Sequence, residues 1–146
     1  MFEMMWRGHI NDPAVEDEFG NKLTYGQIVS KWEHIVNVLE IRSVIYFSCK
    51  RDIESVSLLY CLMDRGMVPI LMEPHRDASS VIRLLENYKA RYVWIEKDLL
   101  DDNDVRVYID TIIEEKKEYI FAKTVFDNGK ISPDLAMLLS TSGSTG

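Results

Sequence analysis

Short apolar runs alternate with amphipathic segments along most of the chain, and this alternation constrains the fold more than any other feature. The runs "SVIYF" (43–47), "MVPILM" (67–72) and "RYVWIE" (91–96) are nearly continuous, which is typical of strands covered on both faces. Between them, apolar residues recur at spacings of three and four, as on one face of a helix. The sequence therefore predicts an α/β fold: a doubly wound, mostly parallel sheet with helices on both faces.

A short β-hairpin is expected before this sheet, over residues 14–24. Gly20 and Asn21 supply the positive φ values that a tight turn needs. Thr24 and Gln27 have the spacing of a capping box and predict that a helix starts there. Its expected inner stripe is Tyr25, Ile28, Trp32, Ile35 and Leu39.

Three more helices are predicted between the strands. The first is capped by Asp52 and ends at Gly66, the second covers residues 77–90, and the third opens at "DDND" (101–104). Their expected inward residues are, in order, Ile53, Val56, Tyr60 and Met63; Val81, Leu84, Leu85 and Tyr88; and Val105, Ile109, Ile112 and Ile113. "EEKKE" (114–118) is interpreted as a solvated helix end.

The rest of the chain is expected to add two strands. "EYIFAKTVF" (118–126) is followed by a turn at "DNGK" (127–130) and by a last strand, "DLAMLL" (134–139). Pro69 has no N–H for the strand ladder, so we expect it near a strand end or at a sheet edge.

Length and charge limit the classes of partner. The 146 residues suit one domain, and a net charge of −7 disfavours nucleic acid and anionic membranes as partners. No apolar run approaches the roughly 18 residues that span a bilayer, and the start lacks a secretory pattern. The two cysteines, Cys49 and Cys61, are not spaced as in a disulfide framework. We therefore expect free thiols and a cytoplasmic protein. His9, His34 and His75 are scattered, so no metal site is predicted.

The segment "STSGSTG" (140–146) is rich in glycine and hydroxyl residues. Such a composition is typical of a linker or a disordered end. It also suits phosphate binding, because glycines let backbone N–H groups approach an anion and hydroxyls add donors. The segment lacks the G-K-[ST] of a Walker A loop, and it carries no cation.

Three segments in order resemble motifs of the adenylate-forming enzymes, which include acyl-CoA synthetases, adenylation domains of peptide synthetases and luciferases. "TSGSTG" (141–146) is similar to their phosphate loop, whose following Pro-Lys would fall beyond Gly146. "LTYGQI" (23–28) resembles L-T-Y-x-E-L, with Gln27 in place of the acid. "LMDRGMVPILMEP" (62–74) resembles the segment around V-P-[IL]-[DN]-P, with slightly compressed spacing. The resemblance covers residues 14–146 and leaves residues 1–13 as an N-terminal extension.

The resemblance implies an ATP-dependent ligase. A carboxylate would attack the α-phosphate of ATP to give an acyl-adenylate and pyrophosphate, and a thiol of coenzyme A or of a phosphopantetheine arm would then take the acyl group. Mg²⁺ would neutralise the phosphates. The β- and γ-phosphates would be held by Thr141, Ser142, Gly143, Ser144, Thr145 and Gly146. No catalytic residue or metal ligand can be carried over.

The resemblance also implies that much of such an enzyme lies outside these residues. The chain is then an N-terminal α/β subdomain cut within the phosphate loop, inactive alone and expected to self-associate. Its partners would be a small carboxylate substrate and the remainder of the parent enzyme. The sequence does not identify the carboxylate or the thiol acceptor.

Four other residues follow predicted strands on the side where ligands bind in such folds. Lys50, Arg51 and a helix N-terminus could lower the pKa of the Cys49 thiol, but no base accompanies it. Lys50 and Arg51 suit a solvated surface better than an anion contact, and His75 is a weaker candidate for a substrate contact. "DDND" lacks the spacing of a calcium loop.

Two other functions stay open on the sequence. One is a stand-alone flavodoxin-like or receiver-like domain, although residues 48–51 are not the acids that a receiver needs after its first strand. The other is a non-catalytic interaction domain with a disordered Ser/Thr/Gly tail.

Overall fold

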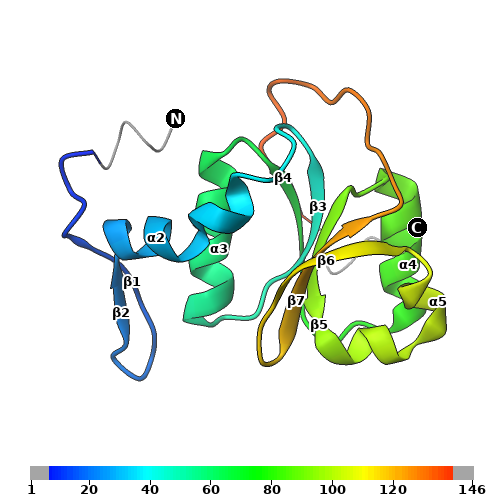
Figure 1. Cartoon of the computed structure of the whole chain (residues 1–146), viewed down its shortest axis with the longest axis horizontal. Coiled ribbons are helices and arrows are strands. Elements are labelled where there is room, and N and C mark those ends of the chain that lie inside the picture. The colour runs from blue at the N-terminus through cyan, green and yellow to red at the C-terminus, as the bar shows by residue number, and fades with distance from the viewer. Residues whose placement is uncertain (1–6, 140–146) are drawn as a thin grey trace.

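The computed structural model describes residues 7–139. Figure 1 shows a small hairpin beside a larger layered unit. The hairpin is antiparallel and consists of β1 (Pro13–Glu16) and β2 (Lys22–Thr24). The larger unit contains β3 (Val44–Ser48), β4 (Val68–Met72), β5 (Tyr92–Glu96), β6 (Ile109–Glu115), β7 (Tyr119–Thr124) and β8 (Leu138–Leu139), in the order β6-β7-β5-β3-β4-β8. Its helices are α2 (Tyr25–Val36), α3 (Ile53–Asp64), α4 (Ala78–Tyr88), the 3₁₀ turn η1 (Lys97–Asp101) and α5 (Asn103–Arg106).

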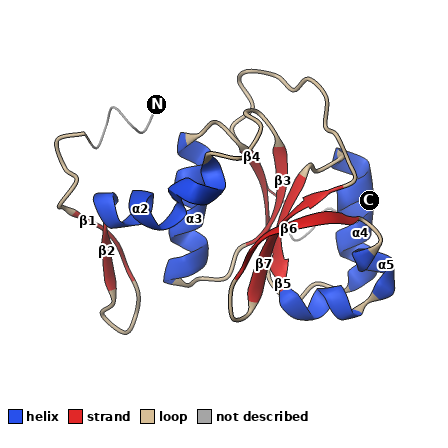
Figure 2. Cartoon of the chain, in the orientation of Figure 1, coloured by secondary structure: helices blue, strands red, loops and turns tan. Residues whose placement is uncertain are grey.

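The sheet is mixed and covered on both faces. The pairs β3–β4, β3–β5 and β4–β8 are parallel, whereas β5–β7 and β6–β7 are antiparallel. Helices α2 and α3 lie on one side of the sheet and α4 and α5 on the other (Figure 2). Alternate side chains of β3 enter the two cores: Ile45 and Phe47 pack with α2 and α3, and Val44 and Tyr46 with α4 and α5. The predicted doubly wound α/β class is confirmed.

The predicted helix caps are confirmed by their hydrogen bonds. Gln27 N donates to Thr24 Oγ1 at 3.2 Å, and Thr24 N donates to Gln27 Oε1 at 2.9 Å, which completes the capping box. Ser55 N donates to Asp52 Oδ1 at 2.8 Å. Gly66 follows α3 with φ +78°, a conformation that glycine adopts without steric cost.

The inner face of α3 differs from the predicted one. Leu58, Cys61 and Leu62 are buried, together with the small polar residues Ser55 and Ser57. The predicted stripe was therefore wrong in part, since Tyr60 is 44% exposed. These small serine side chains leave room for two large rings. The indole N–H of Trp32 in α2 donates to Ser57 Oγ at 2.7 Å, and that of Trp94 in β5 donates to Ser55 Oγ at 3.2 Å. In α4, Tyr88 was likewise predicted to point inward but is exposed.

The helix predicted to open at "DDND" is present for only one turn, so the prediction for the residues that follow was wrong. α5 ends at Arg106, and residues 109–115 form β6. Ile109, Thr111, Ile112 and Ile113 are β-branched, and such side chains favour a strand over a helix. Residues 114–118, interpreted as a helix end, instead contribute the end of β6 and the turn into β7, where Lys116 N donates to Tyr119 O at 2.8 Å.

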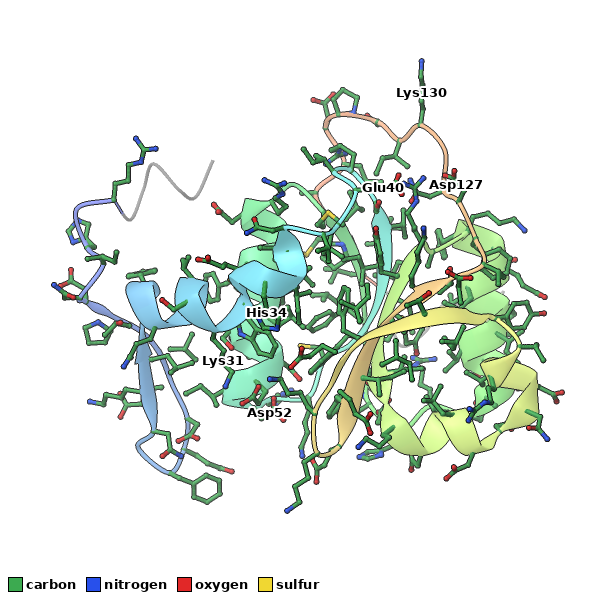
Figure 3. All side chains as sticks on the ribbon, viewed as in Figure 1. Lys31, His34, Glu40, Asp52, Asp127 and Lys130 are labelled. Atoms are coloured by element: carbon green, nitrogen blue, oxygen red, sulfur yellow. The ribbon has the colours of Figure 1, made fainter. Side chains whose placement is uncertain are left out.

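The last strand reaches the far edge of the sheet by a long crossover. Residues 125–137 run over the amino ends of the strands, as Figure 1 shows, and Asp127 and Lys130 lie on this crossover in Figure 3. The Arg42 guanidinium donates to the carbonyl oxygens of Ser132 and Leu135. The predicted strand 134–139 is consequently limited to Leu138–Leu139.

Pro69 lies where the strand ladder does not need its missing N–H. It is the second residue of β4 and pairs in register with Ile45 of β3. On the other side of β4, β8 pairs only from Ile70 onward. The expectation of a place near a strand end is confirmed.

Candidate functional site

The carboxyl ends of β3, β4, β5 and β8 share one edge of the sheet, because these strands are parallel. Ligands of open α/β sheets bind outside this edge. Asp52, which caps α3 here, is labelled in Figure 3. A cleft of about 610 Å³ opens at the edge and is lined by Lys50, His75, Glu96, Lys97, Asp98, Asp101, Lys117, Glu118 and Tyr119.

The Glu96 carboxylate forms the buried floor of this cleft. Its side chain ends β5, and the residue is only 7% exposed. Ser48 Oγ donates to Glu96 Oε1 at 2.9 Å, and His75 N donates to the same oxygen at 2.6 Å. One carboxylate thus connects the end of β3, the loop after β4 and the end of β5.

Two buried tyrosines lie close enough to Glu96 for its charge to affect them. Burial raises the pKa of Tyr46, and the negative charge of Glu96 raises it further. Burial and Glu96 likewise raise the pKa of Tyr119. Both phenols are therefore neutral at physiological pH, and neither is suited to act as a base.

The rim of the cleft carries ion pairs between the strand ends and the β6–β7 turn. Lys50 Nζ lies 2.7 Å from Glu118 Oε2, and Lys97 Nζ lies 2.7 Å from Glu115 Oε1. The hydrogen bond between Lys50 and Glu118 raises the pKa of the lysine and lowers that of the carboxyl group. These two cations are thus neutralised by neighbouring carboxylates.

Cys49 does not have the environment of a reactive thiol. Its side chain is half-buried, and its backbone N donates to Met72 O at 2.8 Å. Burial raises the pKa of the thiol, Asp52 adds to this effect, and Arg51 opposes it. Arg51 lowers this pKa, as the sequence suggested it could, but burial and the capping carboxylate outweigh it, so the net change in pKa is upward.

The structure brings two of the four predicted strand-end residues into one cleft. Lys50 and His75 both line it, whereas Cys49 and Arg51 do not. Glu96 and Tyr119 were missed by the sequence analysis. An acid that ends an otherwise apolar run, as in "RYVWIE", is the feature that points to Glu96, because such a residue reaches the ligand edge.

The predicted phosphate-loop residues, Thr141, Ser142, Gly143, Ser144, Thr145 and Gly146, lie outside the described residues. The structure does place the strand that precedes them. Leu138 and Leu139 pair with Ile70 and Leu71 of β4 in parallel. The chain therefore reaches the carboxyl edge at Leu139, directly before the predicted loop.

Residues 7–139 contain neither a metal-ligand cluster nor a membrane-spanning helix. No cluster of three or more histidine, cysteine or acidic side chains is placed to hold a metal ion in this range. Within the same range, no helix has both the length and the apolar character to cross a bilayer.

Comparison with solved structures gives the same fold in a larger protein. Apo MatB from Rhodopseudomonas palustris matches 63% of this chain with a TM-score of 0.55 and 15% identity. ATP-bound MatB matches 61% with a TM-score of 0.51 and 16% identity. An ATP-bound RpMatB-BxBclM chimera matches 61%, with a TM-score of 0.53 and 16% identity.

In each case the match covers 19% of the other chain. No protein-family model matches the sequence, and no curated protein matches it. At this level of identity the comparisons show a shared fold.

Proposed function

We propose that this chain, whose fold is shared with part of MatB, is the N-terminal portion of an ATP-dependent ligase that activates carboxylates as acyl-adenylates. The observation that carries the proposal is the position of β8. It brings the chain to the carboxyl edge of the sheet at Leu139, immediately before a sequence that resembles the phosphate loop of adenylate-forming enzymes. One structural neighbour, MatB, was solved with ATP bound, which supports ATP as the nucleotide of the proposed ligase.

The proposed role of residues 141–146 is to hold the β- and γ-phosphates of ATP. Backbone N–H groups beside glycines and the hydroxyls of Thr141, Ser142, Ser144 and Thr145 supply donors without charge. Mg²⁺, when bound, would neutralise phosphate charge. The lining cations Lys50 and Lys97 are engaged by Glu118 and Glu115, whereas Lys117, which also lines the cleft, is a further positive charge at this edge.

The proposal places the remaining chemistry elsewhere in a larger protein. The chain spans 19% of the length of the MatB structures it matches, so the acyl pocket and the thiol site, for coenzyme A or a phosphopantetheine arm, are assigned to the rest of the ligase. We propose that the 146 residues alone do not catalyse the reaction. We also propose that the ligase acts on a small carboxylate and is located in the cytoplasm, where the free thiols Cys49 and Cys61 are stable.

Nucleotide titrations of the protein that contains this chain test the loop assignment. A Thr145→Val exchange removes a hydroxyl without changing size, and we expect it to weaken ATP binding about ten- to a hundredfold, the effect of losing one hydrogen bond to a charged group. AMP binding should stay unchanged, because AMP lacks the β- and γ-phosphates.

The matched control is Thr111→Val, which removes an exposed hydroxyl from β6 and should leave both affinities unchanged. Equal losses of ATP and AMP affinity in Thr145→Val would contradict the assignment of the loop to the terminal phosphates. An unchanged ATP affinity would do the same.

A further inference from the structure

Loop 73–77 crosses the carboxyl end of β3 and is held at three points. At its start, Met72 O accepts a hydrogen bond from Cys49 N at 2.8 Å. At its end, Asp77 caps α4 and accepts from Ser80 N at 3.1 Å. In the middle, His75 N donates to Glu96 Oε1 at 2.6 Å. The two ends are therefore fixed by β4 and α4, whereas the middle depends on Glu96.

His75 has a backbone conformation that needs such support. Its φ is +63°, in the left-handed region that side chains with a Cβ disfavour. The residue lines the cleft and is exposed, so its side chain is not packed in the core. The hydrogen bond from its N–H to the buried carboxylate holds this conformation at the edge of the cleft.

Glu96 is itself held in place by buried neighbours. Its side chain is fixed by the hydroxyl of Ser48, which is 1% exposed. The same Oε1 receives both hydrogen bonds, so the position of His75 is tied to the end of β3 as well as to β5. Hydrogen bonds to a charged acceptor contribute more than neutral ones.

We propose that Glu96 is a positioning residue that latches loop 73–77 across the strand ends and holds His75 at the mouth of the cleft. The latch fixes one wall of the cleft before any ligand arrives. Without it, the middle of the loop is free to leave the left-handed conformation while β4 and α4 stay folded. The evidence for the latch is the hydrogen bonding of residues 48, 75 and 96. It does not depend on whether the chain belongs to an ATP-dependent ligase.

Amide hydrogen exchange measured by NMR on the 146-residue chain tests the latch. In Glu96→Ala, we expect the His75 amide to exchange about ten- to a hundredfold faster, the factor for losing a hydrogen bond to a charged group. Its proton resonance should also lose the downfield shift of a short charge-assisted bond. Amides of α2, on the hairpin side of the sheet, should keep their rates.

Two further variants separate the latch from a general loss of stability. Glu96→Gln keeps an acceptor oxygen and should restore most of the protection at His75. Glu73→Gln removes the same charge from an exposed position in the same loop and should change nothing.

A His75→Gly background provides the second measurement if Glu96→Ala unfolds. Glycine adopts positive φ without steric cost, so this background should lessen the harm of Glu96→Ala and allow folding. An unchanged exchange rate at His75 in Glu96→Ala overturns the proposal. Equal acceleration in Glu96→Ala and Glu73→Gln, or no rescue by Glu96→Gln, overturns it as well.

Discussion

At the scale of single residues, helix α3 shows where apolar character and burial diverge. Tyr60 and Met63 fit a helical stripe by spacing, yet the buried face runs through Ser55, Leu58 and Leu62. The sequence could predict that this segment is a helix and where it is capped. It could not predict the rotation of the helix, because the two tryptophans that demand small serines lie on α2 and β5.

This difference gives a direct test by mutation. Leu58→Ala opens a cavity at a position with 0% exposure and should lower the free energy of unfolding by about 2–5 kcal/mol. Tyr60→Ala, at 44% exposure, should cost less than about 1 kcal/mol, as is usual for surface positions. Urea unfolding followed by tryptophan fluorescence measures both. If Tyr60→Ala lowered the free energy of unfolding more than Leu58→Ala, the result would support the inner face predicted from spacing and contradict the observed one.

At the scale of elements, the β6–β7 hairpin is the part that sequence patterns described least well. Ile109, Ile112 and Ile113 fit a helical stripe as well as a strand, and Ile112 is 46% exposed in β6. The pairing partner decides between a helix and a strand. β7 pairs with β5 on one side and offers its other side to residues 109–115. This pairing depends on the whole sheet, so a local sequence pattern does not predict it.

Glu114 joins this hairpin to α2. Its Oε2 lies 3.0 Å from Nε2 of His34, which is labelled in Figure 3, and its Oε1 lies 2.9 Å from Lys116 Nζ. Lys116 Nζ also lies 5.0 Å from the ring centroid of Trp32. The hydrogen bond from Lys116 lowers the pKa of the Glu114 carboxyl group, and His34 contributes to the same shift.

A pH dependence follows from the lowered pKa of Glu114. The unfolded chain binds a proton more readily than the folded one, so the stabilisation is present above the ordinary value of 4.5 and is lost as pH falls through the folded pKa. Glu114→Gln should therefore lower the free energy of unfolding by about 0.2–1 kcal/mol at pH 7. The difference from the native chain should shrink below pH 4.5.

Urea unfolding at a series of pH values measures this difference. Glu18→Gln, in the exposed β1–β2 turn, is the control for the loss of one charge. A difference between Glu114→Gln and the native chain that does not change with pH would contradict the assigned ion pair.

At the scale of the whole molecule, the crossover of residues 125–137 determines where the chain arrives. Arg91 pairs with Glu40 and Asp127 at the amino edge, and Arg42 binds the backbone at Ser132 and Leu135. These contacts carry the chain past the amino ends of the strands and return it, as β8, to the carboxyl edge. The sequence predicted strands and turn but not this path, because the ion pairs join residues that are far apart in the chain.

We propose that this chain delivers a phosphate loop to the ligand edge of a carboxylate-activating ligase. Exchange of labelled pyrophosphate into ATP, measured with a panel of carboxylates, tests it most directly. We predict that the protein containing this chain shows carboxylate-dependent exchange, that Thr145→Val lowers it roughly a hundredfold, as losing one transition-state donor does, and that the 146 residues alone show none. Absence of exchange with every carboxylate, or exchange by the 146 residues alone, would contradict this proposal.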